Sequence, residues 1–530
     1  MTVSNRLFSA SWSYGLAVVC GIFQALAFDA DVSSPLRWLS PVFSCLSLIG
    51  FLSLIERFSP KRLALLGYLF GLGLFGWGLN WIYISMATFG GASLLFAVLA
   101  NIGVIAYLSL YWLTTAYLIA RLGKTTNQRL LLAAPIIALL EWLRSLLFIG
   151  FPWLSIGYAW IDTPLAQLSR FGGVFLVSFT VILACAVTLL TVKKTSKVLL
   201  LSGLLVAVAV FVIPFSTTGE KPGLRQPVEQ SAKQSIKVAL LQGNMPVITR
   251  YDDERMTDNL MTYSRLTDEV IHREDNIELV IWPESAIPYF YQEVGDFLTV
   301  IDAMQRHQDF DLIAGLPTAD WSKKIFYNSI LLKKKNDNNN LPQFYHKQHL
   351  LAFGEYLPFR WLFAFFNDFV AIPRGDFSRG DAVQQPFVSH GVAFSPSICF
   401  EAVFGDEIRR NAAQADVLLN ISNDAWFGRS KAQLQHLNIA RMRAIENQKM
   451  LIRATNNGRT VIVDQRGQIT QSIPAFQRGY LVGRVSANRQ LTVYARFGDT
   501  PWIVFFTLML CLILMFGQLK TSRLYLSEQR

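Results

Sequence analysis

Long apolar stretches alternate with short polar segments over the first 215 residues and return near the C-terminus. A bilayer core about 30 Å thick needs about 20 apolar residues per helix, and most of these stretches reach that length. The pattern predicts eight membrane-spanning segments, although residues 63–120 can be divided in more than one way. The predicted segments are 14–28, 38–55, 63–86, 92–120, 130–149, 171–192, 198–215 and 500–519.

Residues 216–496 have a different pattern, in which short apolar runs rich in β-branched residues alternate with helical periods. The stretch 216–235 is polar and contains proline and glycine, which is typical of a linker. Alternating strands and helices predict an α/β domain whose sheet is largely buried on both faces. The predicted strands are 236–244, 277–285, 310–318, 327–334, 391–402 and 415–424, with helices at 253–273 and 431–449.

The pattern therefore predicts four regions: seven helices over 1–215, a linker over 216–235, a soluble domain over 236–496, and a last helix with its tail over 497–530. Several predicted strands end in polar or reactive side chains. Ligand sites of open α/β folds gather where strands end, so one sheet edge is expected to carry the chemistry. These strand-end residues are Gln242, Glu284, Cys399, Asn423 and Asp424.

Composition and charge agree with a membrane protein. Hydrophobic residues make up 52% of the chain and charged residues 16%, and the formal net charge is +11. Residues 216–496 hold 32 basic and 30 acidic residues, so the positive excess belongs to the apolar segments and their loops. Nucleic-acid binding is not needed to explain it.

The basic loops also orient the helices. With eight spans, the loops 56–62, 121–129 and 193–197, each with three Lys or Arg, fall on one side together with both termini. The positive-inside rule makes that side the cytoplasm, and a long domain follows its helices rather than its own charge. The soluble domain is then expected on the outer face.

Two charged residues, Glu141 and Arg144, interrupt the fifth apolar segment. Ionisable groups at membrane depth are often functional. A structural ion pair at a helix interface is the alternative reading, and the sequence favours it.

Three residues of the soluble domain are candidates for chemistry. Cys399 is the only one of the five cysteines outside the apolar segments, so it is either a small buried residue or a nucleophile. Glu284 directly follows the strand ELVIW, where a carboxylate is costly unless it is paired or perturbed; a surface strand end is the alternative. Lys347 has apolar and aromatic neighbours. His346 and His349 flank it, but no metal-ligand spacing supports a zinc site.

Four motifs taken together resemble the nitrilase, or carbon–nitrogen hydrolase, superfamily: WPESAIP, YHKQHLLAFGEYLPF, SICFE and LLNISNDAWFG. The segments GLGLFGWGLNWIY (71–83), EWLRSLLFIGFPWLSIGY (141–158) and ARMRAIE (440–446) resemble its membrane-integral branch, the apolipoprotein N-acyltransferase family. The resemblance covers nearly the whole chain. It implies a polytopic α-helical membrane domain with an inserted αββα-sandwich domain.

The resemblance also implies residue roles. Glu284 would be the general base, Lys347 the stabiliser of the oxyanion, and Cys399 the nucleophile. Supporting roles would fall to Glu355, Glu401 and the backbone N–H of Phe400. The chain departs from the family pattern at three positions, which concern details of substrate contact: Phe400 replaces a common tyrosine, Ala352 a proline, and Tyr251 a tryptophan.

The activity implied is a ping-pong acyl transfer. A phospholipid, expected to be phosphatidylethanolamine, would acylate the cysteine, and the N-terminal amine of a diacylated apolipoprotein would then accept the chain. No nucleotide, metal or redox cofactor is implied. The implied location is the bacterial inner membrane, with the catalytic domain on the periplasmic face.

Aromatic side chains are expected at a lateral entry for lipid, formed by the segments 148–158 and 282–291. Trp153, Phe290 and Tyr251 are the residues predicted there, and plain interfacial anchoring is the alternative. Two other functions stay open at this point. One is a membrane-tethered amidase or nitrilase that uses water as its second nucleophile, although tethering needs one helix rather than eight. The other is a transporter or scaffold that carries a degenerate enzyme domain.

Overall fold

The computed structural model describes residues 3–29, 31, 34–55, 58–192, 234–246, 252–335, 342–356 and 377–528. Their contacts divide the chain into two units. The helical unit comprises Met1–Trp81, Val98–Pro222 and Phe497–Arg530, and the α/β unit comprises Ile82–Ala97 and Gly223–Arg496. The predicted span 198–215 and nearly all of the predicted linker 216–235 lie outside the described residues.

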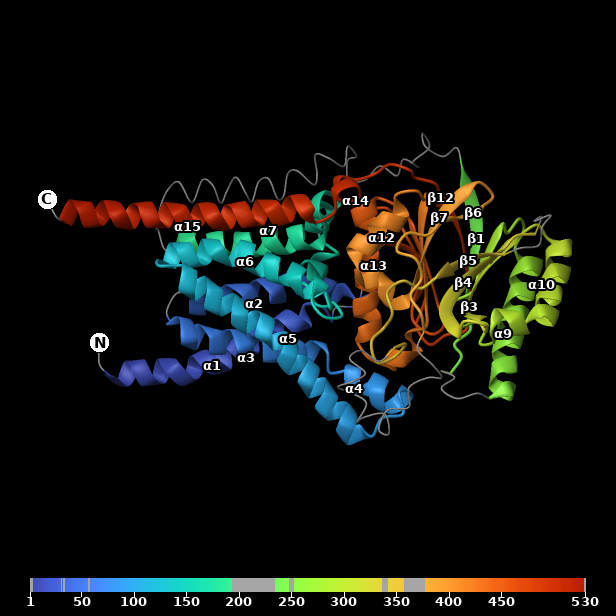
Figure 1. Ribbon diagram of the computed structural model, residues 1–530, viewed down its shortest axis with the longest axis horizontal. Coiled ribbons are helices and arrows are strands. Elements are labelled where there is room, and N and C mark those ends of the chain that lie inside the picture. Colours follow the sequence, from blue (N-terminus) through green and yellow to red (C-terminus); the bar gives the residue numbers. More distant parts are fainter. Residues whose placement is uncertain are drawn as a thin grey trace. The chain divides into compact units, whose positions relative to one another are not determined.

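Long apolar helices make up the helical unit (Figure 1). Each predicted apolar segment that the structure describes overlaps one of them. The helices are α1 (Val3–Leu26), α2 (Leu39–Ile55), α3 (Pro60–Gly78), α5 (Leu94–Leu122), α6 (Thr126–Leu146), α7 (Ser169–Val192) and α15 (Thr500–Glu528). Short helical turns lie between or beside them: η1 (Pro35–Trp38), η3 (Ile156–Trp160) and η4 (Pro164–Leu168).

The segment predicted as one span over 63–86 is broken. Helix α3 ends at Gly78, and the chain continues through the short α4 (Ile82–Ile84) and the π-helical turn η2 (Ser85–Phe89). This continuation belongs to the α/β unit, where the Ser85 hydroxyl donates to the carbonyl of Trp426 at 2.8 Å. An apolar run therefore contains a segment that packs on the soluble domain.

Within the described residues, two helices are long and apolar enough to cross a membrane, at Leu94–Leu122 and Pro164–Val192. A third is possible if the broken pair formed by Pro60–Gly78 and Ile82–Thr88 counts as one span. The prediction of eight spans is therefore not confirmed by helix length. Shorter apolar helices lie at Trp12–Leu26, Leu39–Ile55 and Thr500–Met515.

The charged residues of α6 hold the chain that follows the helix. Arg144 Nη1 donates to the carbonyls of Phe151 at 2.7 Å and Trp153 at 2.6 Å, and Glu141 Oε1 accepts the Ile156 N–H at 2.8 Å. Both charged side chains are buried. A structural role explains them, because they satisfy backbone groups that would otherwise be buried unpaired.

The α/β unit contains two six-stranded sheets, with strand orders β12-β1-β2-β3-β4-β5 and β11-β10-β9-β8-β7-β6. The first sheet comprises β1 (Ser235–Gln242), β2 (Leu279–Ile281), β3 (Asp311–Asp320), β4 (Ile325–Lys333), β5 (Gln343–His346) and β12 (Gly479–Ser486). The second comprises β6 (Phe387–Ser389), β7 (Val392–Ile398), β8 (Val417–Ser422), β9 (Leu451–Thr455), β10 (Thr460–Val463) and β11 (Ile469–Ile473).

Helices cover the outer face of each sheet (Figure 1). Helices α9 (Asp253–Arg273) and α10 (Gly295–His307) cover the first sheet, and α12 (Gly405–Ala412) and α13 (Ala432–Asn447) cover the second. The Asp252 carboxylate caps α9 by accepting the Arg255 N–H. Short turns η5 (Tyr291–Glu293), η7 (Cys399–Val403), η8 (Asp424–Phe427) and α14 (Val493–Phe497) complete the unit.

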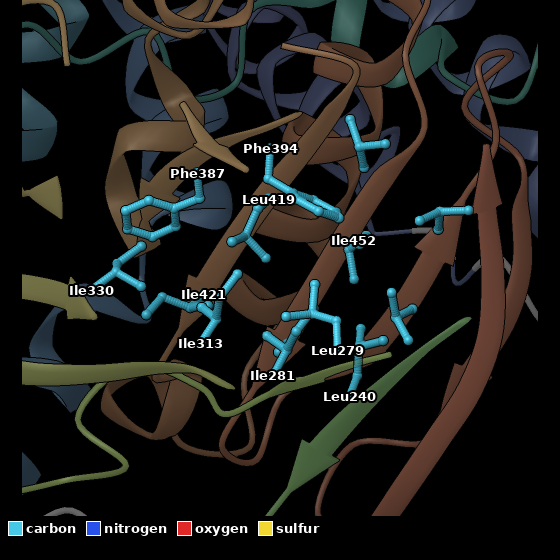
Figure 2. Close-up of a cluster of buried hydrophobic side chains, with 14 of the residues drawn as sticks. Leu240, Leu279, Ile281, Ile313, Ile330, Phe387, Phe394, Leu419, Ile421 and Ile452 are labelled. Carbon is cyan, nitrogen blue, oxygen red and sulfur yellow. The ribbon is translucent and has the colours of Figure 1, made fainter. Parts of the chain in front are cut away.

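The core of the unit lies between the two sheets. Figure 2 shows side chains such as Leu279 and Ile313 of the first sheet packed with Phe394 and Leu419 of the second, all fully buried. Burying one such side chain contributes about 1.5–3 kcal/mol. The layers are therefore helix, sheet, sheet, helix, which confirms the αββα sandwich.

Parallel pairing brings strand ends together. Strands β1, β2 and β3 run parallel in the first sheet, and β7, β8 and β9 run parallel in the second. Strand β5 is antiparallel to β4, which is antiparallel to β3, so β5 ends at the same edge as β3. Residues that follow β2, β5, β7 and β8 can therefore share one site.

Candidate active site

Glu284 lies three residues after β2, and the fold supplies partners for both of its carboxylate oxygens. Oε2 accepts the backbone N–H of Asn423, just after β8, at 2.8 Å. Oε1 accepts the side-chain amide of Asn328 in β4 at 3.0 Å and lies 3.7 Å from Lys347 Nζ. Burial raises the pKa of Glu284, and the charge of Lys347 partly opposes that rise. A carboxylate with a raised pKa is suited to accept a proton near neutral pH.

Glycine is required beside Glu284. A Cβ atom on Gly315 of β3 would lie 2.7 Å from both the Glu284 Cα and the Pro283 carbonyl oxygen. Any side chain at this position would therefore displace the backbone that carries the carboxylate.

Lys347 directly follows β5, and its side chain is only 3% exposed. Its ammonium group donates to Glu355 Oε1 at 2.9 Å. Burial alone would lower the pKa of Lys347, but the carboxylates of Glu355 and Glu284 outweigh it and raise the pKa above its ordinary value. The lysine is therefore charged at any physiological pH.

Asn328 links the two glutamates to the lysine. Its side-chain amide donates to Glu284 and, at 2.8 Å, to Glu355 Oε1. Its backbone carbonyl accepts the N–H of Lys347 at 2.8 Å. Asn328 is not recognisable from the sequence as a site residue, because an asparagine inside a predicted strand carries no distinguishing pattern.

Cys399 directly follows β7, and its backbone has a φ of 51°, in the left-handed region that a non-glycine residue seldom adopts. Burial and the nearby Glu284 raise the pKa of the thiol, Lys347 opposes that rise, and a hydrogen bond with Ser422 also lowers it. The resting thiol is therefore neutral. It requires a base to remove its proton as it attacks.

Glu401 holds the turn beside Cys399. Its carboxylate accepts hydrogen bonds from the backbone N–H groups of Ile398, Gln348 and His349 and from the hydroxyl of Tyr345. Burial raises the pKa of Glu401 to about 7. Each of these four partners is a donor, so the site is built for the ionised carboxylate. Glu401 thereby ties the chain after β5 to the end of β7.

The residues predicted at a lipid entry have different surroundings. Trp153 is fully buried beside Trp81 and Phe151 in the helical unit, so it does not form an open rim. Phe290 is half-buried and packs against Trp321 and Phe326. Tyr251 lies outside the described residues.

Other strand-end and histidine predictions are settled by their contacts. The Gln242 amide donates to the carbonyls of Pro474 and Gln477, which is a structural role. The ring of His346 bonds the Ser329 hydroxyl, and the ring of His349 bonds Glu407 at 2.9 Å.

Together these residues form a site for attack by a thiol on a carbonyl carbon. The site has a thiol without charge at rest, a buried carboxylate of the kind that can take its proton, and a buried ammonium of the kind that can stabilise an oxyanion. This combination on an αββα sandwich defines the carbon–nitrogen hydrolase class, and residues 237–492 match the family model described as "Carbon-nitrogen hydrolase".

Residues 20–187 match a second family model, described as "Apolipoprotein N-acyltransferase N-terminal domain". Apolipoprotein N-acyltransferase of Vibrio cholerae is 36% identical over 493 residues, covering 92% of this chain and 93% of that protein. The protein of that name from Pseudomonas syringae is 33% identical over 480 residues, covering 89% and 90%. The chain belongs to the apolipoprotein N-acyltransferase family.

Among solved structures, Saccharomyces cerevisiae Nit3, a member of branch 10 of the nitrilase superfamily, is similar with a TM-score of 0.38 and 16% identity. The match covers 48% of this chain and 92% of that chain.

Proposed function

We propose that this protein transfers a fatty acyl chain from a membrane phospholipid, through a thioester on Cys399, to the N-terminal amine of a diacylated lipoprotein. The observation that carries the proposal is the cluster of Glu284, Lys347 and Glu355, in which the charges of Glu284 and Lys347 act on the Cys399 thiol just after β7. Family membership over most of the chain supports the identity of the two substrates. Phosphatidylethanolamine is the donor we propose.

In the first half-reaction, Cys399 Sγ attacks the carbonyl carbon of the phospholipid ester while Glu284 takes the thiol proton. The carbonyl oxygen becomes an oxyanion, which the Lys347 ammonium and the backbone N–H of Phe400 stabilise. As the tetrahedral intermediate collapses, the C–O bond breaks. Glu284 returns the proton to the departing lysophospholipid alkoxide, and the acyl thioester remains.

In the second half-reaction, the lipoprotein's free α-amine attacks the thioester carbonyl and Glu284 accepts the amine proton. The C–S bond then breaks, and the thiolate of Cys399 regains the proton. A thioester divides one difficult transfer into two easier steps. The net reaction exchanges an ester for an amide and consumes no other reagent.

The need for an amine acceptor distinguishes this acyl transfer from hydrolysis, in which water accepts the acyl group. Purified protein in mixed micelles of phosphatidylethanolamine and detergent should acylate a diacylated lipopeptide with a free N-terminal amine. The same lipopeptide with an acetylated amine should remain unchanged. Release of free fatty acid at the same rate with or without the amine would instead support a membrane-tethered amidase or esterase.

We also propose a membrane topology of eight spans, with the α/β unit on the periplasmic side of the bacterial inner membrane. The charge of the loops supports this arrangement. Lys323, whose side chain is 71% exposed, offers a site to test it. In a cysteine-free background, Lys323→Cys should react with a membrane-impermeant maleimide in intact spheroplasts, and Lys124→Cys in loop 121–129 should react only after lysis. The reverse pattern would exclude the topology.

Aromatic residues near the site are proposed to guide lipid substrates, with Phe290 as the residue to test. Phe290→Ser should raise the KM for phospholipid more than it changes kcat. An unchanged KM would leave Phe290 as a packing residue of the cluster with Trp321 and Phe326.

A further inference from the structure

A cluster of buried polar side chains lies next to the backbone carbonyl of Cys399. It is formed by His436 of α13, Asp424 of η8 and Arg453 of β9, each at most 1% exposed. His436 Nε2 lies 3.1 Å from the carbonyl oxygen of Cys399. None of these three side chains belongs to the glutamate, lysine and cysteine set described above.

The partners of the imidazole ring assign its protons. A carbonyl oxygen can only accept, so Nε2 carries a hydrogen and donates it to Cys399. Arg453 Nη2 lies 3.0 Å from Nδ1 and can donate to it. Burial and the charge of Arg453 lower the pKa of His436, and Asp424, whose Oδ1 lies 3.2 Å from Nδ1, opposes that shift without reversing it. The ring is therefore the neutral tautomer with hydrogen on Nε2.

Arg453 and Asp424 fix the ring in this orientation. The guanidinium donates to both oxygens of Asp424 at 3.0 Å, and it also bonds the Asn420 side chain. The hydroxyl of Ser422 donates to Asp424 Oδ1 at 2.7 Å. The ring is thus supported from β8, which pairs with the strand β7 that precedes Cys399, and from β9, which pairs with β8.

Two other roles for this cluster are disfavoured by the same contacts. Ligand atoms of Cys399, Asp424 and His436 lie within 4.8 Å of one another, a spacing that could suit a metal ion. However, Arg453 already occupies the Asp424 carboxylate, and a cation would face its buried positive charge. The ring is also poorly placed as a general base, since Nε2 donates its hydrogen to the Cys399 carbonyl and Nδ1 is occupied by Arg453 at 3.0 Å and Asp424 at 3.2 Å.

The carbonyl of Cys399 and the N–H of Phe400 belong to one planar peptide unit, and in a trans peptide they point in opposite directions. Holding the carbonyl therefore also sets the direction of that N–H. Cys399 has a positive φ, which is a strained backbone conformation for a residue other than glycine. Such a conformation persists only when surrounding contacts hold it, and the hydrogen bond from His436 is one such contact. A hydrogen bond to the carbonyl also polarises the peptide and strengthens its N–H as a donor.

We infer that His436, held by Asp424 and Arg453, is a positioning residue that aims the Phe400 N–H at the oxyanion formed during acyl transfer. The inference rests on the proposed function, because it needs a tetrahedral intermediate at Cys399. It assigns His436 a role in catalysis through the backbone of the nucleophile, without contact to substrate.

The test compares substitutions that keep or lose a donor at the position of Nε2. The amide nitrogen of glutamine in His436→Gln can reach about as far as Nε2, whereas that of His436→Asn falls one methylene short. The rate of acyl-thioester formation is measured by intact-protein mass spectrometry at saturating phosphatidylethanolamine, across a range of pH, with thermal stability recorded for each variant.

We expect His436→Asn to form the thioester about 10- to 100-fold more slowly than wild type, below the full cost of losing an oxyanion donor. His436→Gln should form the thioester at least about tenfold faster than His436→Asn. The half-saturating phospholipid concentration should stay unchanged, and so should the acid limb of the rate–pH curve, because Glu284 remains the base.

Equal rates for the two variants would overturn the inference, whether both match wild type or both are equally slow. Loss of the acid limb in His436→Asn would also overturn it and make His436 the base. If His436→Asn does not fold, His436→Gln is compared with wild type alone. Its rate of thioester formation should then lie within tenfold of the wild-type rate. Failure of the wild-type protein to form a thioester would instead overturn the proposed function.

Discussion

Replacing Lys347 with methionine should remove a charge that two carboxylates share. Lys347 Nζ lies 3.7 Å from Glu284 Oε1 and 2.9 Å from Glu355 Oε1, and both carboxylates are nearly buried. Methionine is similar in length and apolar, so the substitution removes the charge with little change in volume. Asn328 still donates to both carboxylates, but no cation balances their charges.

The size of the effect follows from these distances. At an effective dielectric constant of about 20, unit charges 3.7 Å apart attract by about 4 kcal/mol. Without that attraction the pKa of Glu284, which burial already raises, should rise further. Loss of one oxyanion donor alone costs about 10²–10³ in rate. Thioester formation in Lys347→Met should therefore slow by at least about 100-fold.

The sign of the pH effect is also fixed. The base acts only when deprotonated, so the rate rises with pH through the pKa of Glu284. Raising that pKa must move the acid limb of the rate–pH curve to higher pH in Lys347→Met. Stability should fall as well, because two buried carboxylates then share one region without a counter-charge.

The assay is single-turnover acylation followed by mass spectrometry between pH 5 and 9. The matched control is Lys323→Met, which removes an exposed lysine paired with Asp320 in the same unit and should keep the wild-type rate and pH limb. A Lys347→Met protein that folds and acylates within threefold of wild type, with the same acid limb, would refute the role assigned to the lysine.

Three further predictions concern the surroundings of the base. Asn328→Ala should slow thioester formation about 10- to 100-fold, because a hydrogen bond to a charged group contributes about 1.5–3 kcal/mol; a rate within twofold of wild type would contradict this. Gly315→Ala should reduce acylation strongly, because the new Cβ would displace the backbone of Glu284. The control Gly295→Ala, whose Cβ would meet nothing within 4 Å, should keep the wild-type activity. Equal activities of the two variants would argue against the close approach of Gly315 to Glu284. In wild type, burial of Glu284 should place the acid limb above the ordinary glutamate pKa of 4.5, and a limb at or below that value in a rate–pH titration would contradict the assigned base.

Much of the α/β unit could be predicted from periodicity and from residue type at strand ends. Helix α9 spans Asp253–Arg273, which are the residues predicted for it. The run predicted at 415–424 contains β8, and the run at 310–318 covers β3 except for its last two residues. The later strands β9 to β12 were missed. Strands β9 to β11 have four or five residues each, and β12 (GYLVGRVS) contains two glycines and an arginine, so their sequences carry a weak strand signal.

Glu284, Lys347 and Cys399 were identified as candidates from the sequence, but the residues that orient them were not. Asn328 and His436 act through contacts with chain segments 19–44 residues away, and such contacts leave no local pattern. Trp153 was predicted at the entry, and the structure buries its side chain. An aromatic residue in a predicted membrane loop can pack inward, and Arg144 holds its backbone there.

The broken segment after α3 shows the limit of hydropathy. Residues 63–86 are apolar enough to predict one span, yet the chain leaves the helix after Gly78 and Ser85 bonds the turn that follows β8. Hydropathy reports which residues avoid water and does not distinguish a lipid contact from a contact with another part of the protein.

The central claim is that Cys399 carries the acyl chain, and intact-protein mass spectrometry tests it most directly. Purified protein is incubated with phosphatidylethanolamine and no acceptor, beside Cys399→Ala and the control Cys185→Ala. The account predicts a gain of one fatty-acyl mass in wild type and Cys185→Ala, none in Cys399→Ala, and loss of that mass when a diacylated lipopeptide amine is added. Folded wild-type protein that modifies the lipopeptide without ever gaining the acyl mass, or a Cys399→Ala protein that still gains it, would contradict the account.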